Sequence, residues 1–278
     1  MPGQAEQHQP GPEAQRGADH KAADQQAAYV LERMLARETL QAEQLRATLL
    51  AGLFASAFGF VGVILLFYPQ GYWMIFKGRI PLYLPLLLLG GMVAYELTMR
   101  QLIGWRRRTG GQIPTVLRYL NAAFEISFPS CIILLSTRVM DPITALFIPQ
   151  LFLYFPMITL SALRLDFRLC AFTGLVAGVE YMALALAFLA SSPAEGFETA
   201  MITPVHHLVK ALLLLATGLV TGLVTLQIKK QLLAVLASQE EKNRVVSMFG
   251  QHVSPEVVNK LLSQPAELGT EVRHVCVM

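Results

Sequence analysis

The residues of this chain that could do chemistry are a few ionisable side chains set inside long apolar segments. Arg118, Asn121 and Glu125 recur at spacings of three and four, so a helix would place them on one face. Glu180 lies in another apolar segment. At about 1.5 Å of rise per residue, its height falls within roughly 5 Å of that of Lys210, counting each from the outer end of its segment. A buried ion pair between Glu180 and Lys210 is therefore one hypothesis.

Two roles fit these polar residues, because an ionisable group inside a bilayer is costly without a partner or a purpose. They could line a ligand pocket that opens outward, or they could hold helices together as a polar network. The set is Arg118, Asn121, Glu125, Glu180, His206, His207 and Lys210. Glu96 and Arg100, one helical turn apart, form a further candidate pair. Haem ligation is disfavoured, because neighbouring residues such as His206 and His207 point about 100° apart on a helix and no other apolar segment supplies a matching histidine.

Metal and nucleic-acid chemistry find little support in the composition. Cys131, Cys170 and Cys276 lack the paired spacing of a metal site or a disulfide framework, so they are interpreted as small hydrophobic residues. The net charge of +3 is spread over the edges of apolar segments rather than gathered in a continuous basic patch. We therefore expect no cofactor in this chain and no nucleic-acid partner.

The elements that must position these residues are membrane helices. Apolar residues make up 54% of the chain and charged residues 15%, whereas soluble proteins carry roughly a quarter charged residues. Six segments approach the ~20 residues that a spanning helix needs. They cover residues 47–68, 80–103, 114–139, 143–163, 169–190 and 204–228. The predicted fold is an all-α membrane protein with a six-transmembrane-helix bundle over residues 47–228, in contact with the lipid bilayer.

Basic residues gather at alternate ends of these segments and predict their orientation, because Lys and Arg favour the cytoplasmic side. The basic groups are Arg33, Arg37 and Arg46; Arg100 and Arg106 to Arg108; Arg164 and Arg168; Lys229 and Lys230. The opposite face carries only Lys77, Arg79 and Arg138. Both termini are thus predicted to be cytoplasmic, in a cell (inner) membrane. No cleavable signal peptide is visible, so the first segment is expected to act as a signal anchor.

The segments outside the bundle divide by composition. Residues 1–23, rich in Gln, Pro, Gly and acids, predict a disordered N-terminus, and residues 24–46 predict a cytoplasmic helix. Residues 229–250 contain no Gly or Pro before Gly250 and predict a helical linker. Leu232 and Leu236 begin a short coiled-coil-like seam whose middle is polar. The linker is either a signalling helix in a dimer or an ordinary solvated connection.

Small residues recur at helical spacing in the last two apolar segments. They are Gly174 and Gly178, then Gly218 and Gly222. Such faces let helices approach closely. They predict either contact within a homodimer or packing inside one bundle, and the sequence leaves both open.

The run FGQHVSPEVVNKLL over residues 249–262 is the most specific motif. Phe249 opens it, Gly250 permits a bend, and Pro255 suits the first position of a short helix over residues 255–262. The run EVRHVCVM over residues 271–278 has the valine pattern of a buried strand. Together these runs resemble the entry to the catalytic domain of class III adenylate/guanylate cyclases, of the bacterial membrane-bound type with a six-helix anchor.

The resemblance to class III cyclases implies a function for the complete protein and a role for this chain within it. Complete members are phosphorus-oxygen lyases that convert ATP to cyclic AMP at a homodimer interface, with two aspartates that hold Mg or Mn. Those positions would follow Met278, so no catalytic or metal residue is carried over, residues 251–278 are expected to be the truncated start of that domain, and residues 1–278 alone are expected to be inactive. The implied role is to anchor, dimerise and regulate the cyclase, perceiving a lipophilic or extracellular ligand as a receptor in signal transduction.

Two alternatives remain. A naturally truncated, non-catalytic partner that pairs with complete cyclases explains the motif equally well. A six-helix transporter or channel subunit would use Glu125, Glu180 and Lys210 as a pathway, because polar residues at membrane depth occur in such proteins. It does not explain the motif that begins at Phe249.

Overall fold

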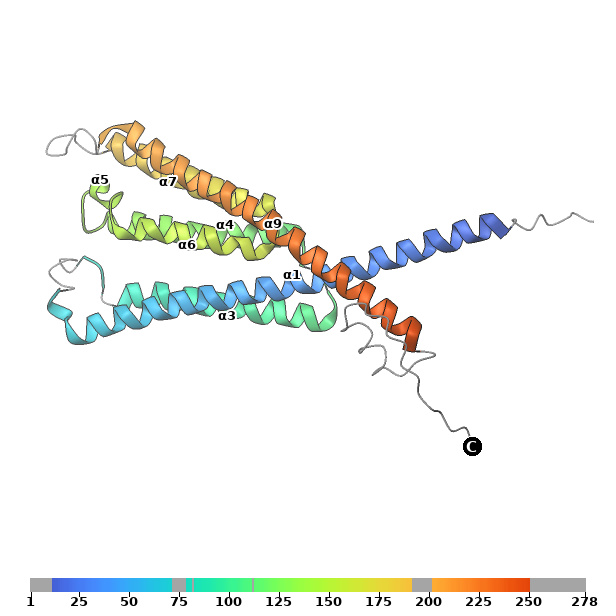
Figure 1. Ribbon diagram of the computed structural model, residues 1–278. Coiled ribbons are helices and arrows are strands. Elements are labelled where there is room, and N and C mark those ends of the chain that lie inside the picture. The colour runs from blue at the N-terminus through green and yellow to red at the C-terminus, as the bar shows by residue number, and fades with distance from the viewer. Residues whose placement is uncertain (1–11, 72–78, 82, 112, 192–201, 251–278) are drawn as a thin grey trace, which may run out of the picture. The chain divides into compact units, whose positions relative to one another are not determined.

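Long helices form the body of this protein. The computed structural model describes residues 12–71, 79–81, 83–111, 113–191 and 202–250, and every regular element within them is helical. The chain divides into two compact units, Met1–Gln231 and Leu232–Met278. The elements (Figure 1) are α1 (Pro12–Phe67), α3 (Tyr83–Thr109), α4 (Thr115–Ser136), α5 (Pro142–Ala145), η1 (Pro149–Leu153), α6 (Tyr154–Leu160), η2 (Ser161–Arg164), α7 (Phe167–Ser191) and α9 (Pro204–Gly250).

Six helical stretches of the described residues are long and apolar enough to cross a membrane. They are Arg33–Phe67, Tyr83–Thr109, Thr115–Ser136, Pro142–Arg164, Phe167–Ser191 and Pro204–Asn243. Each coincides with one of the six apolar segments predicted from the sequence. The prediction of an all-helical protein with six membrane-length helices is therefore confirmed. The predicted short helix over residues 255–262 and the strand over residues 272–278 lie outside the described residues.

Helix α1 is longer than expected. It begins at Pro12, so residues 12–23, which the composition assigned to a disordered N-terminus, are helical. Proline suits the first turn of a helix, and the Ala, Glu and Gln residues that follow are good helix formers. No proline follows Pro12 before the helix ends at Phe67, so the predicted cytoplasmic helix and the first membrane segment form one element. Residues 1–11 lie outside the described residues.

The fourth apolar segment is not a single α-helix. It is divided into α5, η1, α6 and η2, with a break at residues 146–148. Proline explains this break, because it lacks an amide hydrogen and disfavours helical backbone in the residue before it. Pro149 opens η1, and the preceding Ile148 is extended, with φ −67° and ψ 150°. The fourth membrane-length stretch, Pro142–Arg164, is thus built from short helical pieces rather than from one continuous α-helix.

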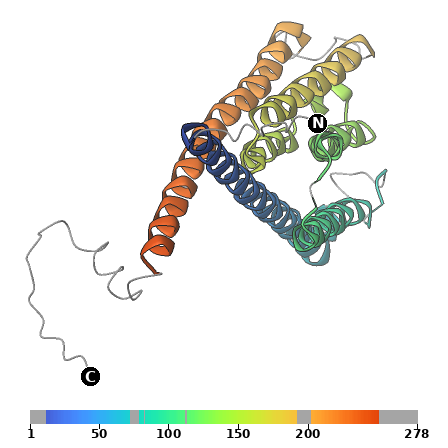
Figure 2. The ribbon, with the colours of Figure 1, turned by 90° about the vertical axis from the view of Figure 1, so that its right-hand side faces the viewer.

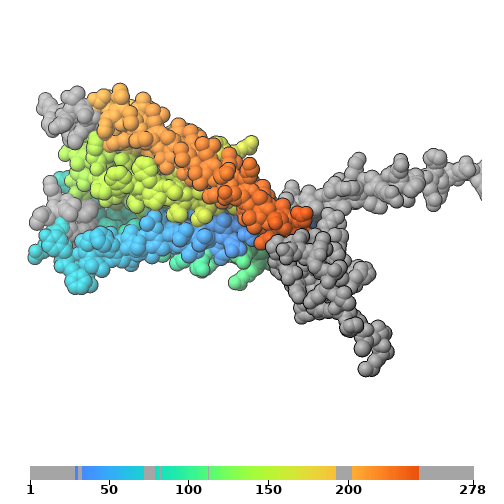
Figure 3. Space-filling view, viewed as in Figure 1, coloured from blue at the N-terminus to red at the C-terminus, as the bar shows by residue number. Residues whose placement is uncertain are grey.

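The helices of Met1–Gln231 pack in neighbouring pairs. Helices α1 and α3 lie side by side in both ribbon views, and α7 lies beside α9 (Figures 1 and 2). Within this unit, α9 contributes part of the outer surface (Figure 3). Its residues Leu212, Val220 and Leu223 are exposed, which suits contact with lipid. Because lipid tails are as apolar as these side chains, close packing and interhelical hydrogen bonds hold such helices together.

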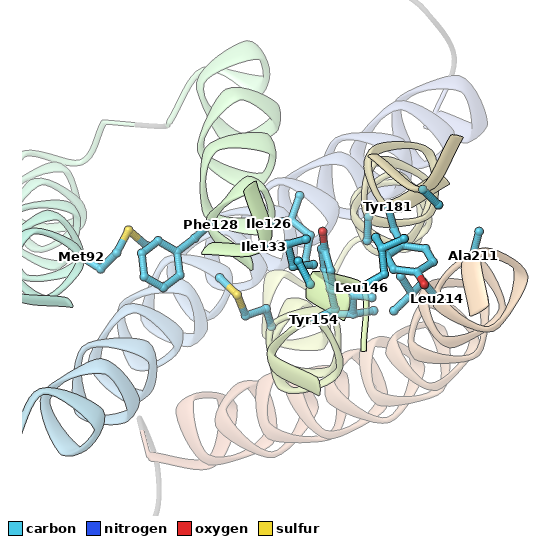
Figure 4. Packing of buried hydrophobic residues seen from close by; sticks show 14 of the residues in the cluster. Met92, Ile126, Phe128, Ile133, Leu146, Tyr154, Tyr181, Ala211 and Leu214 are labelled. Carbon is cyan, nitrogen blue, oxygen red and sulfur yellow. The ribbon is translucent and has the colours of Figure 1, made fainter. Parts of the chain in front are cut away.

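The apolar core runs across the unit between the helix pairs. Met92 and Phe128 lie on one side, while Tyr181, Ala211 and Leu214 lie together on the other (Figure 4). Their shared neighbours fill the middle of the core: Ile126, Ile133, Leu146 and Tyr154. All of these residues are at least nine-tenths buried. The core therefore joins α3, α4, α6, α7 and α9 into one bundle.

Candidate functional site

Glu125 of α4 is the acceptor at the centre of a buried ionic cluster. Its Oε2 atom accepts hydrogen bonds from Arg46 Nη1 at 2.5 Å and from Arg164 Nη2 at 2.8 Å. Asn121 Nδ2 donates to Oε1 at 2.7 Å. The side chains of Arg46, Glu125 and Arg164 are only 1%, 6% and 2% exposed, so solvent salt screens their charges little. We call this group the ionic cluster: Glu43, Arg46, Tyr95, Glu96, Arg118, Asn121, Glu125 and Arg164.

Arg118 extends the ionic cluster towards α1 and η2. Its Nε atom donates to Glu43 Oε1 at 2.7 Å, and its Nη2 atom donates to the carbonyl of Arg164 at 2.8 Å. Arg164 Nη1 donates in return to the carbonyl of Arg118 at 3.0 Å. The second carboxylate oxygen of Asp166 lies 3.8 Å from Arg118 Nη1. This reciprocal pairing fixes the start of α4 against the end of η2.

A tight turn after η2 places Arg164 within the ionic cluster. Leu165 adopts a left-handed backbone with φ 53°, which ends η2 directly after Arg164. Asp166 Oδ1 then accepts the backbone N–H of Arg168 at 2.9 Å, which caps the N-terminus of α7. The chain thereby reverses within two residues. Arg164 is held at the end of the fourth membrane segment instead of extending into solvent.

Helix α3 adds Tyr95 and Glu96 to the ionic cluster. Tyr95 Oη donates to Asn121 Oδ1 at 2.5 Å. Glu96 is fully buried, and neither carboxylate oxygen has a hydrogen-bond partner. The predicted pair of Glu96 with Arg100 is not formed, since Arg100 is exposed while Glu96 faces the interior. Arg100 lies one helical turn from the buried Glu96, but the long arginine side chain lets its guanidinium group reach the surface.

The predicted inward face of α4 is confirmed, with partners that the sequence analysis missed. Asn121 and Glu125 are each 5% exposed, and Arg118 contacts both α1 and η2. Arg46 and Arg164 had been assigned to the basic edges of membrane segments, so their burial was not expected. The sequence did contain an indication of this burial. An acid such as Glu125 inside an apolar segment requires a cation at a similar depth, and Arg46 and Arg164 are cations at such a depth. Removing one partner of such a cluster leaves an uncompensated buried charge.

Glu180 of α7 occupies a second polar group, formed with hydroxyls. Ser127 Oγ donates to Glu180 Oε1 at 2.5 Å, and Ser130 Oγ donates to Glu180 Oε2. Ser130 Oγ also lies 2.6 Å from Tyr154 Oη. We call these residues the hydroxyl cluster. It joins α4, α6 and α7 near the middle of α7, which agrees with the interpretation of Glu180 as part of a polar network.

Lys210 of α9 lies elsewhere, so the hypothesis of a direct Glu180–Lys210 ion pair is wrong. Lys210 Nζ lies 3.7 Å from the centre of the Phe147 ring and 3.5 Å from the carbonyl oxygen of Leu146. It is also 5.9 Å from the ring of Tyr181. Equal depth along two helices does not make two side chains face each other, because rotation about each helix axis is an independent variable. Here that rotation turns Glu180 towards α4 and Lys210 towards the α5–η1 connection.

The two adjacent histidines contact different neighbours. His207 is fully buried, and its Nδ1 atom lies 2.9 Å from Tyr181 Oη. His206 is exposed and stacks on Phe147, with ring centres 5.5 Å apart and planes at 20°. The seven predicted polar residues are therefore divided among three groups: the ionic cluster, the hydroxyl cluster, and a group around Phe147 that contains His206, His207 and Lys210.

The predicted small-residue faces pack inside one bundle. A Cβ atom built on Gly174 would lie 2.7 Å from the Cα atom of Gly218, and one on Gly178 would lie 2.9 Å from the carbonyl oxygen of Ala211. A Cβ on Gly222 would lie 2.7 Å from the Phe167 ring. Gly174, Gly178 and Gly218 let α7 and α9 touch through their backbones, and Gly222 leaves room for the Phe167 ring. Of the two alternatives for these four residues, the structure supports packing within one chain.

Four of the five predicted signal-transmission residues lie in the C-terminal half of α9. Leu232 is half-buried and Leu236 is buried. The backbone of Phe249 and Gly250 is helical, and Gly250 ends the element. Pro255 lies outside the described residues. The predicted helical linker over residues 229–250 is thus confirmed as a helix, and it continues the last membrane helix without interruption.

These polar groups can act electrostatically, by pairing opposite charges between helices. Within the described residues, no cluster of three or more His, Cys, Asp or Glu side chains could hold a metal ion. Cys170 is buried and its thiol donates to the carbonyl of Ser161 at 3.3 Å, while Cys131 is exposed on α4. The ionic cluster can fix helix positions. Comparisons with protein-family models, curated proteins and solved structures find no match to this chain.

Proposed function

We propose that this chain is the membrane anchor and the dimerising, regulatory region of a class III adenylate cyclase. In the complete enzyme, the catalytic domain would convert ATP to cyclic AMP and pyrophosphate with Mg or Mn. The observation that carries the proposal is the continuity of α9. This helix runs from Pro204 in the bundle to Gly250, and the run FGQHVSPEVVNKLL, which resembles the entry to a cyclase domain, begins at Phe249.

The bundle supplies a physical route from the membrane to this helix. Thr225 of α9 is fully buried, and its hydroxyl contacts the carbonyl of Ala162 in η2 at 3.4 Å. Ala162 precedes Arg164 of the ionic cluster by two residues. A rearrangement of the ionic cluster would therefore reach α9 at Thr225, close to the end of the apolar segment predicted over residues 204–228. Continuous helices carry such shifts well because their backbone hydrogen bonds make them stiff.

Homodimer contact in the proposal is assigned to α9 beyond Gln231, at the seam that begins with Leu232 and Leu236. Leu236 is buried within the single chain, so dimerisation would exchange its present contacts for those of the partner. The glycines of α7 and α9 already pack against the other helix of the same chain. The linker is therefore the better candidate for the homodimer contact. A short, partly polar seam suits a switch, because neither of two dimer arrangements is strongly favoured.

The test of the cyclase proposal is direct. The coding sequence around residues 1–278 is read for an in-frame cyclase domain whose first metal-binding aspartate follows within a few residues of Met278. Cyclic AMP is then measured in membranes from cells that express the complete reading frame. Production of cyclic AMP that depends on that aspartate supports the proposal. A complete reading frame that lacks a cyclase domain contradicts it.

The two alternatives give different results in the same membranes. A non-catalytic partner would co-purify with an active cyclase made from another gene. A transporter or channel would move ions or solutes across liposomes. Glu125, Glu180 and Lys210 belong to three groups with separate partners, which gives the transporter pathway no specific support.

A further inference from the structure

Lys210 lies beside an apolar pocket and has no anionic partner among the residues that the structure describes. Within the described residues it forms no ion pair, and its contacts are the Phe147 ring, the more distant Tyr181 ring and one long hydrogen bond to the Leu146 carbonyl. The pocket beside it has a volume of about 370 Å³. Its apolar walls are Phe147, Leu151, Phe152, Phe155, Leu213 and Leu214. Ligand sites in proteins typically have volumes of about 300–1,000 Å³, so the pocket is large enough for a small molecule.

The charge beside this pocket indicates that its ligand carries an anionic group. A lysine ammonium has three donors, and here one hydrogen bond and one aromatic face leave donor capacity unused. Glu180 does not pair with Lys210, because its carboxylate accepts hydrogen bonds from the hydroxyls of Ser127 and Ser130. An uncompensated cation at membrane depth is costly, and an anionic group bound next to it would remove that cost.

The shape of the pocket indicates that the remainder of the ligand is apolar. The polar groups, Lys210 and His206, belong to α9, whereas the opposite wall is formed by η1 and the start of α6. Phe152 and Leu213 are 68% and 54% exposed, so the apolar wall is accessible from the outside of the bundle. A single flexible hydrocarbon chain with an anionic end matches one cationic edge and one long apolar wall.

We propose that this pocket binds a free fatty acid, with its carboxylate at Lys210 and His206 and its chain along Leu151, Phe152 and Leu213. Such a ligand would join η1 to α9, the helix that continues to Gly250. Its role as a regulatory input rests on the cyclase function proposed above, whereas its binding does not. A failed cyclic AMP assay would leave the binding result intact, and failed binding would leave the cyclase proposal intact.

The experiment uses the purified 278-residue chain in nanodiscs of phosphatidylcholine. The probe is dodecanoate that carries a diazirine near the end of its chain, with the equivalent dodecanol as the uncharged comparison. Lys210→Met removes the charge with little change in length, and Lys210→Arg keeps it. Leu213→Trp fills the pocket without touching the charge. Lys230→Met is the matched control, because Lys230 is an exposed lysine on the same helix.

The expected result is cross-linking of dodecanoate to peptides from η1, α6 and α9. Lys210→Met should weaken dodecanoate binding about 10-fold or more, as expected for loss of a hydrogen bond between charged groups, and leave dodecanol binding unchanged. Lys210→Arg should retain the preference for dodecanoate, Leu213→Trp should weaken both probes, and Lys230→Met should change neither.

Three outcomes would overturn this proposal. One is unchanged dodecanoate binding in folded Lys210→Met protein. Another is cross-linking to the separate apolar cavity that Val61, Leu88 and Phe128 line between α1, α3 and α4. The third is loss of dodecanoate binding when phosphatidylglycerol replaces part of the phosphatidylcholine, because an anionic lipid of the bilayer would then be the occupant.

Discussion

Glu125 receives hydrogen bonds from two buried arginines, so its charge balances more than one neighbour. Glu125→Gln keeps the shape of the side chain and removes the charge, which leaves Arg46 and Arg164 undercompensated. We expect the free energy of unfolding to fall by about 3 kcal/mol or more, in the range measured when a buried ion pair loses one partner. The measurement is unfolding of the purified protein by SDS in mixed micelles, followed by circular dichroism.

The matched control for this change is Glu241→Gln on α9, where the glutamate is exposed. An exposed charge contributes little to stability, so this variant should differ from the native protein by less than about 1 kcal/mol. Equal stability of the Glu125→Gln and Glu241→Gln proteins would show that the ionic cluster does not hold the helices together.

Glu180 and Lys210 provide a second test at the scale of residues. They have no shared partner, because Glu180 accepts from Ser127 and Ser130 while Lys210 contacts Phe147. In a double-mutant cycle, the effects of Glu180→Gln and Lys210→Met on unfolding should add to within about 0.5 kcal/mol. Lys210→Met alone should not destabilise the protein, since it removes a charge that lacks an anionic partner. A coupling energy above about 1 kcal/mol would restore the direct pair.

Residue type was easier to predict than residue partner. The polar positions of α4 were identified because helical periodicity places Arg118, Asn121 and Glu125 on one face. Their partners depend on the axial offset between helices far apart in the chain, which no local pattern records. Arg46 was assigned to a membrane edge for this reason, although its side chain is 1% exposed. The same limit produced the incorrect pair of Glu180 with Lys210.

The contact between α7 and α9 can be tested at the scale of helices. An alanine at Gly174 would place its Cβ atom 2.7 Å from Gly218 Cα and 3.0 Å from the carbonyl oxygen of Leu214. Because these are backbone atoms, the helices must separate. We expect Gly174→Ala to lower the free energy of unfolding by about 1–3 kcal/mol, the typical cost of overpacking. The same SDS titration measures it.

Gly91 of α3 is the matched control, because a Cβ atom there would meet no atom within 4 Å. Alanine favours a helix over glycine by up to about 1 kcal/mol, so Gly91→Ala should leave stability unchanged or raise it. If both alanine variants were equally stable, the close approach of α7 and α9 would be ruled out.

Hydropathy predicted which segments form membrane-length helices, because length and apolar content are properties of a single segment. It did not predict the division of the fourth segment, where Pro149 interrupts the backbone while the side chains stay apolar. Composition, in turn, assigned residues 12–23 to a disordered N-terminus, where Ala, Glu and Gln continue the helix from Pro12. Apolarity and helix formation are separate properties, and the errors lie where they diverge.

For the whole molecule, six membrane-length helices imply that the regions before the first and after the last lie on the same side, if all six span the bilayer. The distribution of Lys and Arg predicts that this side is cytoplasmic. Arg108 and Arg138 test it, because both are exposed and they lie near opposite ends of neighbouring spans. Each is replaced by cysteine in a protein whose native cysteines are alanine.

A maleimide that cannot cross membranes then labels intact cells that express each variant. Arg138→Cys should react in intact cells, whereas Arg108→Cys should react only after the membrane is opened. The reverse pattern would place the C-terminal end of α9 outside the cell, where ATP is scarce, and would remove the basis for a cytoplasmic cyclase domain after Gly250. Labelling of both variants in intact cells would show that α4, which lies between them, does not span the bilayer.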